Sequence, residues 1–399
     1  MVTKDATFEN ALAFAQDLIR LPSPSGEEEA VARRVAEEMD ALGYDAITTD
    51  EVGNVIGVIH GSGSAPRVLL NCHTDIVAAG DPAEWEHPPF EAVVKGGFLH
   101  GRGAMDIKGP LALQTYAAAM LRGRTEGDVV VAHTVLEERG GWGMEHLMTE
   151  AGMKADVVII GESTHGDVAI GHRGRGELEV VLRGLAGHAS APGRARNALD
   201  LLPPVLAAVR DLAANQPSDP MLGASSLVAT GIDVLPESRN VIPDQVTVVI
   251  DWRVLPGTTF EDMTAAVEAA IRGRLATVPD GFGIDVRMAQ ERQRTWTGLE
   301  RDRQMFSPGF MVDADHAVVR AATEAVGRRV GEGPATARPW TFATDGGWSC
   351  GVHGIPTIGF APGEERFAHT NTERLDVDEA RWALSRYPEL ILAVQQAVG

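Results

Sequence analysis

The chain has 399 residues, of which 44% are hydrophobic, and it carries a formal net charge of −21. The length predicts two domains with sizeable cores, and the negative charge excludes binding to nucleic acid or to an anionic membrane surface. No apolar stretch is long enough to span a bilayer, and the acidic N-terminal segment lacks the apolar core of a cleavable signal. Because Cys72 and Cys350 are too few for a disulfide framework, we expect a cytoplasmic protein.

Helix and strand patterns alternate along the first 174 residues. Helical periodicity covers residues 7–20, 27–42, 110–122 and 144–150, and apolar strands are expected at 54–59, 67–71, 129–135 and 155–160. The glycine-rich segment 101–109 lacks the spacing of a phosphate-binding loop, so we exclude a nucleotide site there. Active-site groups in α/β sheets gather at the carboxyl ends of strands, which directs attention to the residues that follow each strand.

Polar residues follow two of these strands. Glu137 and Glu138 come after the strand at 129–135, and neighbouring side chains on an extended backbone point in opposite directions. One carboxylate can therefore bind a metal while the other faces substrate or water. His73 and Asp75 follow the strand at 67–71, and their spacing places both side chains on the same side of an extended chain. A metal-bound histidine usually donates its second ring N–H to a carboxylate, so we expect Asp75 to orient His73.

The pattern changes near Gly174 and resumes near Met311. Between them, strands are expected at 177–182, 245–253 and 283–288, with helices at 198–212 and 260–274. The strand-helix-strand-strand-helix-strand order indicates an inserted ferredoxin-like domain. The C-terminal part adds helices at 315–326 and 378–397 and a strand at 355–360.

Five candidate metal ligands lie at the ends of separate elements. Two imidazoles and three carboxylates suit zinc, cobalt or manganese and argue against a structural thiolate zinc site. A carboxylate-rich set also suits a two-metal hydrolase, in which ions about 3.5–4 Å apart share a bridging carboxylate. The candidates are His73, Asp106, Glu138, Glu162 and His369.

These motifs, in this order, carry a resemblance that covers nearly the whole chain. The chain resembles the di-zinc amidohydrolases and metallopeptidases that include aminoacylase, acetylornithine deacetylase, succinyl-diaminopimelate desuccinylase, dipeptidases and carboxypeptidase G. The matching segments are Pro22-Ser23, His73-Thr74-Asp75, Gly101-Arg102-Gly103, Asp106-Ile107-Lys108-Gly109, Glu137-Glu138, Gly161-Glu162, Gly187-His188-Ala189-Ser190, Asn240-Val241-Ile242-Pro243 and His369-Thr370.

The resemblance implies an α/β fold with two domains. A mixed-sheet catalytic domain with helices on both faces would occupy residues 1–174 and 293–399. A ferredoxin-like α+β domain, serving as lid and dimerisation surface, would occupy residues 175–292. The protein would act on a small molecule as a homodimer and would bind neither nucleic acid nor membranes.

The resemblance also implies a role for each site residue. Two divalent ions are expected, zinc first, with cobalt or manganese as alternatives. His73 and Glu162 would hold one ion, Glu138 and His369 the other, and Asp106 would bridge them. Glu137 would be the general base. His188 would stabilise the oxyanion in the active site of the neighbouring subunit.

Three residues are candidates for binding a substrate carboxylate, namely Asn240, Arg253 and Arg173. An arginine has a planar fork that matches a carboxylate, although Arg253 is equally well explained as a strand-end charge. The chain departs from the desuccinylase pattern at Ala191, where that branch has a tyrosine. Trp340 and Trp348 either line a flat apolar pocket or belong to the core, and the pocket interpretation favours an aryl or bulky acyl group.

The function that these features indicate is hydrolysis of a C–N bond, usually an amide, in a small carboxylate-bearing molecule. An N-acyl amino acid deacylase ranks first and a dipeptidase or carboxypeptidase second. A hydrolase of a non-peptide C–N bond, such as that of an aromatic amine, ranks third, and a non-catalytic binding protein on the same fold ranks last because Glu137 is intact.

The other histidines match no motif. We expect packing or surface roles for them, and for His172, near the domain junction, contact with substrate is the less favoured alternative. The rest of the set is His60, His87, His100, His133, His146, His165, His316 and His353.

Overall fold

The computed structural model describes residues 4–327 and 333–398, and contacts between residues divide the chain into two compact units. Unit 1 takes 1–172, 293–301 and 311–399, and unit 2 takes Arg173–Arg292 and Asp302–Phe310. The expected insertion at 175–292 falls in unit 2. The further segment belongs to unit 2 because β20 (Phe306–Ser307) pairs with β10 (Gly174–Arg183). Within the described ranges, no helix combines the length and apolar character needed to cross a membrane.

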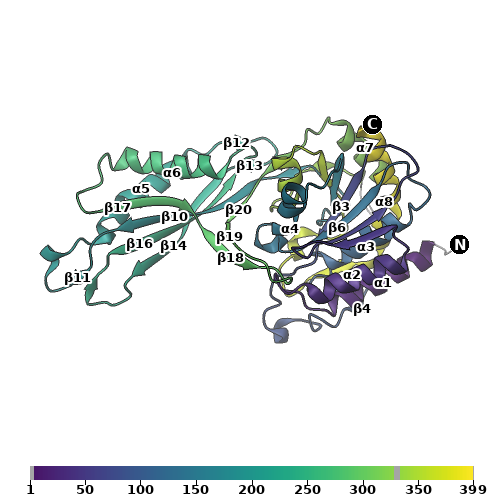
Figure 1. Cartoon of the computed structure of the whole chain (residues 1–399), viewed down its shortest axis with the longest axis horizontal. Coiled ribbons are helices and arrows are strands. Elements are labelled where there is room, and N and C mark those ends of the chain that lie inside the picture. The colour runs from purple at the N-terminus through teal and green to yellow at the C-terminus, as the bar shows by residue number, and fades with distance from the viewer. Residues whose placement is uncertain (1–3, 328–332, 399) are drawn as a thin grey trace. The chain divides into compact units, whose positions relative to one another are not determined.

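An eight-stranded mixed sheet lies at the centre of unit 1 (Figure 1), in the order β1-β2-β6-β3-β7-β23-β8-β22. Its central strands β6, β3, β7 and β23 run parallel, whereas β1 and β2 are antiparallel additions at one side. The central strands are fully buried, which explains their continuous Val- and Ile-rich sequences. The bounds are β1 (Ala46–Thr49), β2 (Val55–Ile59), β3 (Val68–His73), β6 (Val129–Thr134), β7 (Val157–Ile160), β8 (Val168–Ala169), β22 (Ala337–Arg338) and β23 (Thr357–Gly359).

Helical segments pack on both faces of this sheet. On one face, Thr115 of α3 is hydrogen-bonded to His133 of β6. Thr357 of β23 points to the opposite face, where it is hydrogen-bonded to Ser349 of η6. The bounds are α1 (Lys4–Ile19), α2 (Glu29–Ala41), η1 (Pro82–Glu84), α3 (Lys108–Ala119), η2 (Glu137–Arg139), α4 (Trp142–Glu145), η3 (His146–Glu150), α7 (Ala317–Val326), η6 (Gly347–Val352), η7 (Glu365–Phe367) and α8 (Val377–Val398).

Short strands complete unit 1 and the connections. β24 (Arg374–Asp376) pairs with β5 (Phe98–His100), which pairs with β4 (Val93–Lys95). This small sheet joins the segment after His369 to the segment before Asp106. The remaining connecting strands are β9 (Gly171–His172), β18 (Gln290–Arg294), β19 (Glu300–Gln304) and β21 (Phe310–Met311).

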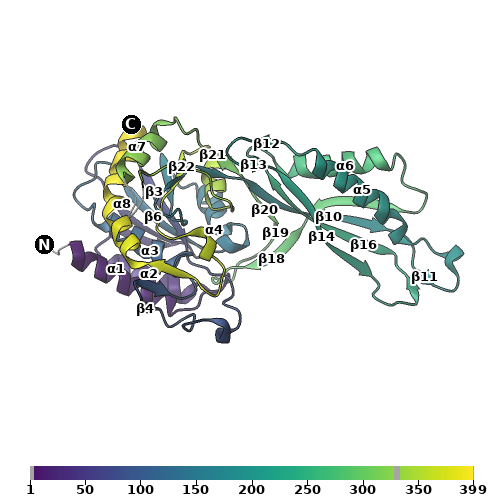
Figure 2. The ribbon, with the colours of Figure 1, turned by 180° about the vertical axis from the view of Figure 1, so that it is seen from behind.

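Unit 2 consists of an antiparallel sheet with α5 and α6 packed on it. Its main strands follow the order β14-β16-β10-β17 (Figure 1). Figure 2 shows α5 and α6 lying along this sheet. Alternate residues of β16, among them Val246, Val248 and Ile250, point into a core that α5 and α6 complete. The bounds are β11 (Gly187–His188), η4 (Pro192–Arg194), η5 (Ala198–Leu201), α5 (Leu202–Ala214), β12 (Ser218–Asp219), β13 (Gly223–Ala224), β14 (Ser226–Leu235), β15 (Val241–Ile242), β16 (Gln245–Val254), α6 (Phe260–Arg274) and β17 (Gly283–Met288).

Candidate active site and metal centre

The five sequence-predicted ligands converge at the carboxyl ends of the parallel strands in unit 1. His73 is the last residue of β3, and Glu162 comes two residues after the end of β7. Asp106 lies in the turn before α3, and Glu138 lies in η2 after β6. These elements adjoin because β3 is paired with both β6 and β7, which explains how distant segments reach one place.

Asp106 lies between the two histidines. Its Oδ1 is 3.3 Å from Nε2 of His73, and its Oδ2 is 3.2 Å from Nε2 of His369. Glu162 Oε1 lies 3.2 Å from the His73 nitrogen, and Glu138 Oε1 lies 3.1 Å from the His369 nitrogen. Each imidazole therefore faces one carboxylate of its own and shares the carboxylate of Asp106.

Glu137 and Glu138 are held in a tight helical turn, so the expected extended backbone is wrong. Leu136 adopts a left-handed φ of 56°, and Gly140 and Gly141 follow with φ of 93° and 71°. A side chain at Gly141 would also meet Asp345 Oδ1 at 2.7 Å. The turn still sends the two carboxylates to different partners. Glu138 faces His369, while Glu137 lies 3.9 Å from the ring of His73.

Asp75 supports both the histidine and this turn. Nδ1 of His73 lies 2.8 Å from the backbone carbonyl of Asp75 and 3.4 Å from its carboxylate. The carbonyl is thus the closer partner, and a proton on Nδ1 leaves Nε2 free as a ligand. The Asp75 carboxylate accepts the backbone N–H groups of Glu137 and Glu138, and it accepts the hydroxyl of Ser25 at 2.6 Å. Asp75 therefore orients the turn of Glu137 and Glu138 as well as the ring of His73, whereas the sequence spacing indicated only the histidine.

Three buried acids near the site were missed by sequence reasoning. Glu28 accepts the backbone N–H of Leu136, and Asp345 accepts the hydroxyl of Thr134. Glu373 accepts the backbone N–H of Asp106. The hydrogen-bond partners of all three acids are remote in sequence, so no local pattern identifies these acids as part of the site. The one local indication is that Glu373 follows the predicted ligand His369 by four residues.

The donor set fits two divalent cations. One ligand atom from each of His73, Asp106 and Glu138 lies within 4.8 Å of the others, and the same holds for His73, Glu137 and Glu162. The buried Oδ1 of Asp106 has no hydrogen-bond partner among residues 4–327 and 333–398. Several carboxylates and two imidazoles facing one another, with few N–H or O–H donors, need positive charge at their centre.

The titration behaviour of the cluster has the same cause. Burial raises the pKa of Glu162 to about 7 and raises the pKa of Glu137 well above its ordinary value. Contacts with Asp106 and Glu138 raise the pKa of His369 to about 10. Without cations, this cluster retains protons that it must release to hold metal ions.

The candidate residues of unit 2 form two separate groups. His188 and Asn240 lie together, because β11 pairs with β15 and the N–H of Ala189 bonds the carbonyl of Asn240. Arg173 and Arg253 lie near the opposite end of β10, where Arg253 already donates to Asp251 at 2.8 Å. Since β10 has ten residues, about 30 Å separates its two ends.

Trp340, Trp348 and His172, the candidate substrate contacts, lie in different environments. Trp340 is buried, and its ring packs on Gly359, so the pocket interpretation is wrong for this residue. Trp348 is half-buried and donates to the carbonyl of Gly140 beside the Glu137 turn. His172 is buried against Thr344, which agrees with packing.

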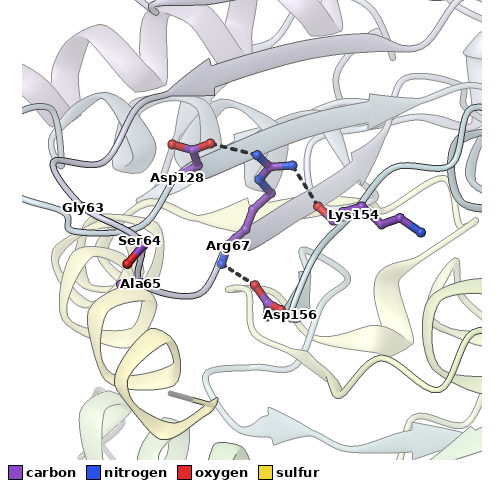
Figure 3. A pocket seen from close by; sticks show the side chains of 7 residues that line it. All are labelled: Gly63, Ser64, Ala65, Arg67, Asp128, Lys154 and Asp156. Carbon is purple, nitrogen blue, oxygen red and sulfur yellow. Dashed lines mark hydrogen bonds and ion pairs between the residues drawn. The ribbon is translucent and has the colours of Figure 1, made fainter.

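A polar pocket of about 360 Å³ marks the opposite end of the same strands (Figure 3). Arg67, Asp128 and Asp156 directly precede β3, β6 and β7. The guanidinium of Arg67 bonds Asp128 at 2.9 Å, and its backbone N–H bonds Asp156 at 2.7 Å. These hydrogen bonds connect the amino-terminal ends of the three strands. The candidate metal ligands lie at the other, carboxyl-terminal ends.

A comparison with protein-family models matches residues 69–393 to peptidase family M20/M25/M40. The chain belongs to this family. The M20 chain is therefore a metal-dependent hydrolase that acts on amide or peptide bonds.

Relatives of this M20 chain include a protein named as uncharacterised and a protein named as a specific enzyme. It is 32% identical over 366 residues to the uncharacterised protein YgeY of Escherichia coli (strain K12), covering 90% of this chain and 88% of the relative. It is 30% identical over 320 residues to succinyl-diaminopimelate desuccinylase of Paracoccus denitrificans (strain Pd 1222), covering 77% of this chain and 80% of that protein.

Solved structures show the same fold. The M20 metallo-carboxypeptidase Sso-CP2 from Sulfolobus solfataricus superimposes with a TM-score of 0.74 at 17% identity, covering 97% of this chain and 99% of that one. The YXEP protein of Bacillus subtilis, described as a dinuclear metal-binding peptidase, gives a TM-score of 0.70 at 16% identity, covering 98% and 99%.

Proposed function

We propose that the protein is an N-acyl amino acid deacylase with a two-ion site. The observation that carries the proposal is the position of Asp106, whose two oxygens face the Nε2 atoms of His73 and His369. His73 and Glu162 would hold one ion, Glu138 and His369 the other, and Asp106 would bridge them. When bound, two such ions, zinc first or cobalt or manganese, polarise a carbonyl and lower the pKa of a water held between them.

In this proposal Glu137 performs the proton transfers. Its carboxylate lies beside the ligand cluster on the turn that Asp75 holds. A buried carboxylate with a raised pKa is suited to take a proton from water and to hand it to the leaving nitrogen. Amide cleavage then releases a carboxylic acid and an amine.

The domain roles also belong to the proposal. We assign catalysis to residues 1–174 and 293–399, and we assign lid and dimer formation to 175–292. The β-α-β-β-α-β order and the sheet order β14-β16-β10-β17 support a ferredoxin-like fold for the insertion. Two free cysteines suit a reducing, cytoplasmic compartment.

For the substrate, we propose two alternative partners of its carboxylate. One is Arg173 or Arg253, and the other is Asn240, which lies beside His188 and would reach the site with it. The desuccinylase name of one relative supports an acylated amino acid, and the carboxypeptidase name of a structural neighbour supports the peptidase alternative. The burial of Trp340 removes one of the two tryptophans that favoured an aryl group.

We test the function with the purified, metal-loaded protein on N-acetyl, N-succinyl and N-benzoyl amino acids, dipeptides, and the same compounds with the carboxylate converted to an amide. We expect the best N-acyl amino acid to exceed the best dipeptide in kcat/KM. Loss of the carboxylate should reduce kcat/KM by about 10–100-fold, since a charge-assisted hydrogen bond contributes about 1.5–3 kcal/mol. Faster cleavage of dipeptides would support the peptidase alternative instead.

We further propose a homodimer through unit 2, in which His188 serves the partner's site. β14 is an edge strand with exposed Val228, Ile232 and Leu235, and an unpaired apolar edge favours association. The chain enters unit 2 at Arg173, and β10 places His188 about 30 Å from that point. This distance favours a role for His188 in the site of the partner subunit.

The mixed dimer of Glu137→Gln and His188→Ala is expected to recover about half of wild-type activity. If His188 acts in the partner's site, one site of this dimer has an intact Glu137 and an intact His188, whereas the other has neither. The subunits are co-expressed with different tags, and the two inactive homodimers are the controls. A folded, metal-loaded mixed dimer without activity would place His188 in the site of its own chain.

A further inference from the structure

Glu373 is a buried carboxylate that lies outside the proposed ligand set but contacts the backbone of one ligand. The residue is 1% exposed, and its Oε1 accepts the backbone N–H groups of Met105 and Asp106, each at 3.1 Å. Its Oε2 accepts from Nη1 of Arg102, which is also buried. One carboxylate therefore fixes the turn that presents Asp106.

The same residue anchors the loop that carries His369. The side chain of His369 is 52% exposed, whereas those of Asp106 and Glu138 are each 11% exposed. Packing therefore restrains His369 least, and its position depends on the backbone of its loop. Glu373 follows four residues later, and its carbonyl accepts the N–H of Gly101. β24 then continues the attachment by pairing with β5.

We propose that Glu373 is a positioning residue for the ion position formed by Asp106, Glu138 and His369. The inference rests on the two-ion site proposed above. By joining the Asp106 turn to the His369 loop, Glu373 sets the 3.2 Å separation between Asp106 Oδ2 and His369 Nε2. The ion position formed by His73 and Glu162 shares Asp106 but takes no ligand from the His369 loop, so it depends less on Glu373.

Two substitutions distinguish the position of the Glu373 carboxylate from its charge. Glu373→Gln keeps an oxygen in reach of both N–H groups but removes the charge that faces Arg102. Glu373→Asp keeps the charge but withdraws it by one methylene. If Glu373 acts by position, the aspartate variant is the more damaged of the two in metal binding.

The test is a titration of metal-free protein with cobalt(II), followed by visible absorption and by competition with a chelator. We expect wild type to bind two equivalents. Glu373→Asp should bind the second about 10–100-fold more weakly, the range typical for loss of a group that orients a metal ligand. It should lose less affinity for the first, which shares only Asp106. Glu373→Gln should lose less. Thermal unfolding of the metal-free proteins reports on the fold separately.

Glu38→Gln is the matched control, because Glu38 is a half-buried acid that is bonded to Arg34 and Tyr116, neither of which is a proposed ligand. Its cobalt affinities should equal those of wild type. Unchanged binding of both ions in the two Glu373 variants, equal loss of both ions, or greater loss in Glu373→Gln would overturn the positioning role. Fewer than two equivalents in wild type would instead overturn the two-ion proposal and this inference with it.

Discussion

Glu137→Gln should leave both metal ions bound and should reduce kcat by about 10²–10⁴-fold, the usual contribution of a general base. Glutamine has nearly the same shape as glutamate but cannot accept a proton at neutral pH. The turn itself should survive, because Asp75 holds it through backbone N–H groups that the substitution keeps.

Glu138→Gln is the matched control on the adjacent residue. Glu138 Oε1 lies 3.1 Å from Nε2 of His369, so this variant should bind one ion less tightly. Elemental analysis and steady-state kinetics on both variants decide the assignment. One ligand atom of Glu137 also lies within 4.8 Å of ligand atoms of His73 and Glu162, so Glu137 could itself bind an ion. If Glu137→Gln emptied a metal position while Glu138→Gln retained both ions, the two roles would have to be exchanged.

Removal of the metal ions should abolish activity, and zinc, cobalt or manganese should restore it. The protein's own side chains at the site are mostly carboxylates, which repel a nucleophilic hydroxide and cannot polarise a carbonyl, so no rate should remain without cations. The experiment compares chelated and reconstituted protein, with metal content measured by elemental analysis.

The metal-free protein should remain folded, because the eight-stranded sheet has an apolar core that does not include the ligands. Its Tm should nevertheless fall, since ions that bind only the native state add about 2.7 kcal/mol at a concentration one hundredfold above Kd. Circular dichroism verifies the fold. Full turnover by folded protein with no measurable metal would contradict the proposed chemistry.

The sequence predicted the ligand cluster because ligands follow apolar strands, and parallel strands end at one edge of a sheet. His73 and Glu162 are found there by that rule alone. The rule did not reveal that Glu137 follows a left-handed Leu136, since the turn depends on remote carboxylates. Nor did it reveal Glu28 or Glu373, whose partners lie about a hundred and about 270 residues away, respectively. A local pattern contains no trace of such contacts.

The pairing of β10 with β17 also bears on how the eight-stranded sheet of unit 1 folds. β7 must find β23, and Ile160 pairs with Gly359 across the whole insertion. Within the insertion, Leu178 pairs with Met288, so the two ends of unit 2 are brought side by side. If unit 2 folds first, it roughly halves the free chain that must close between β7 and β23, which saves about 0.6 kcal/mol of loop entropy. Prior folding of the insertion would then offset most of the closure entropy that its own length adds, so the sheet would form faster than with the insertion still unfolded.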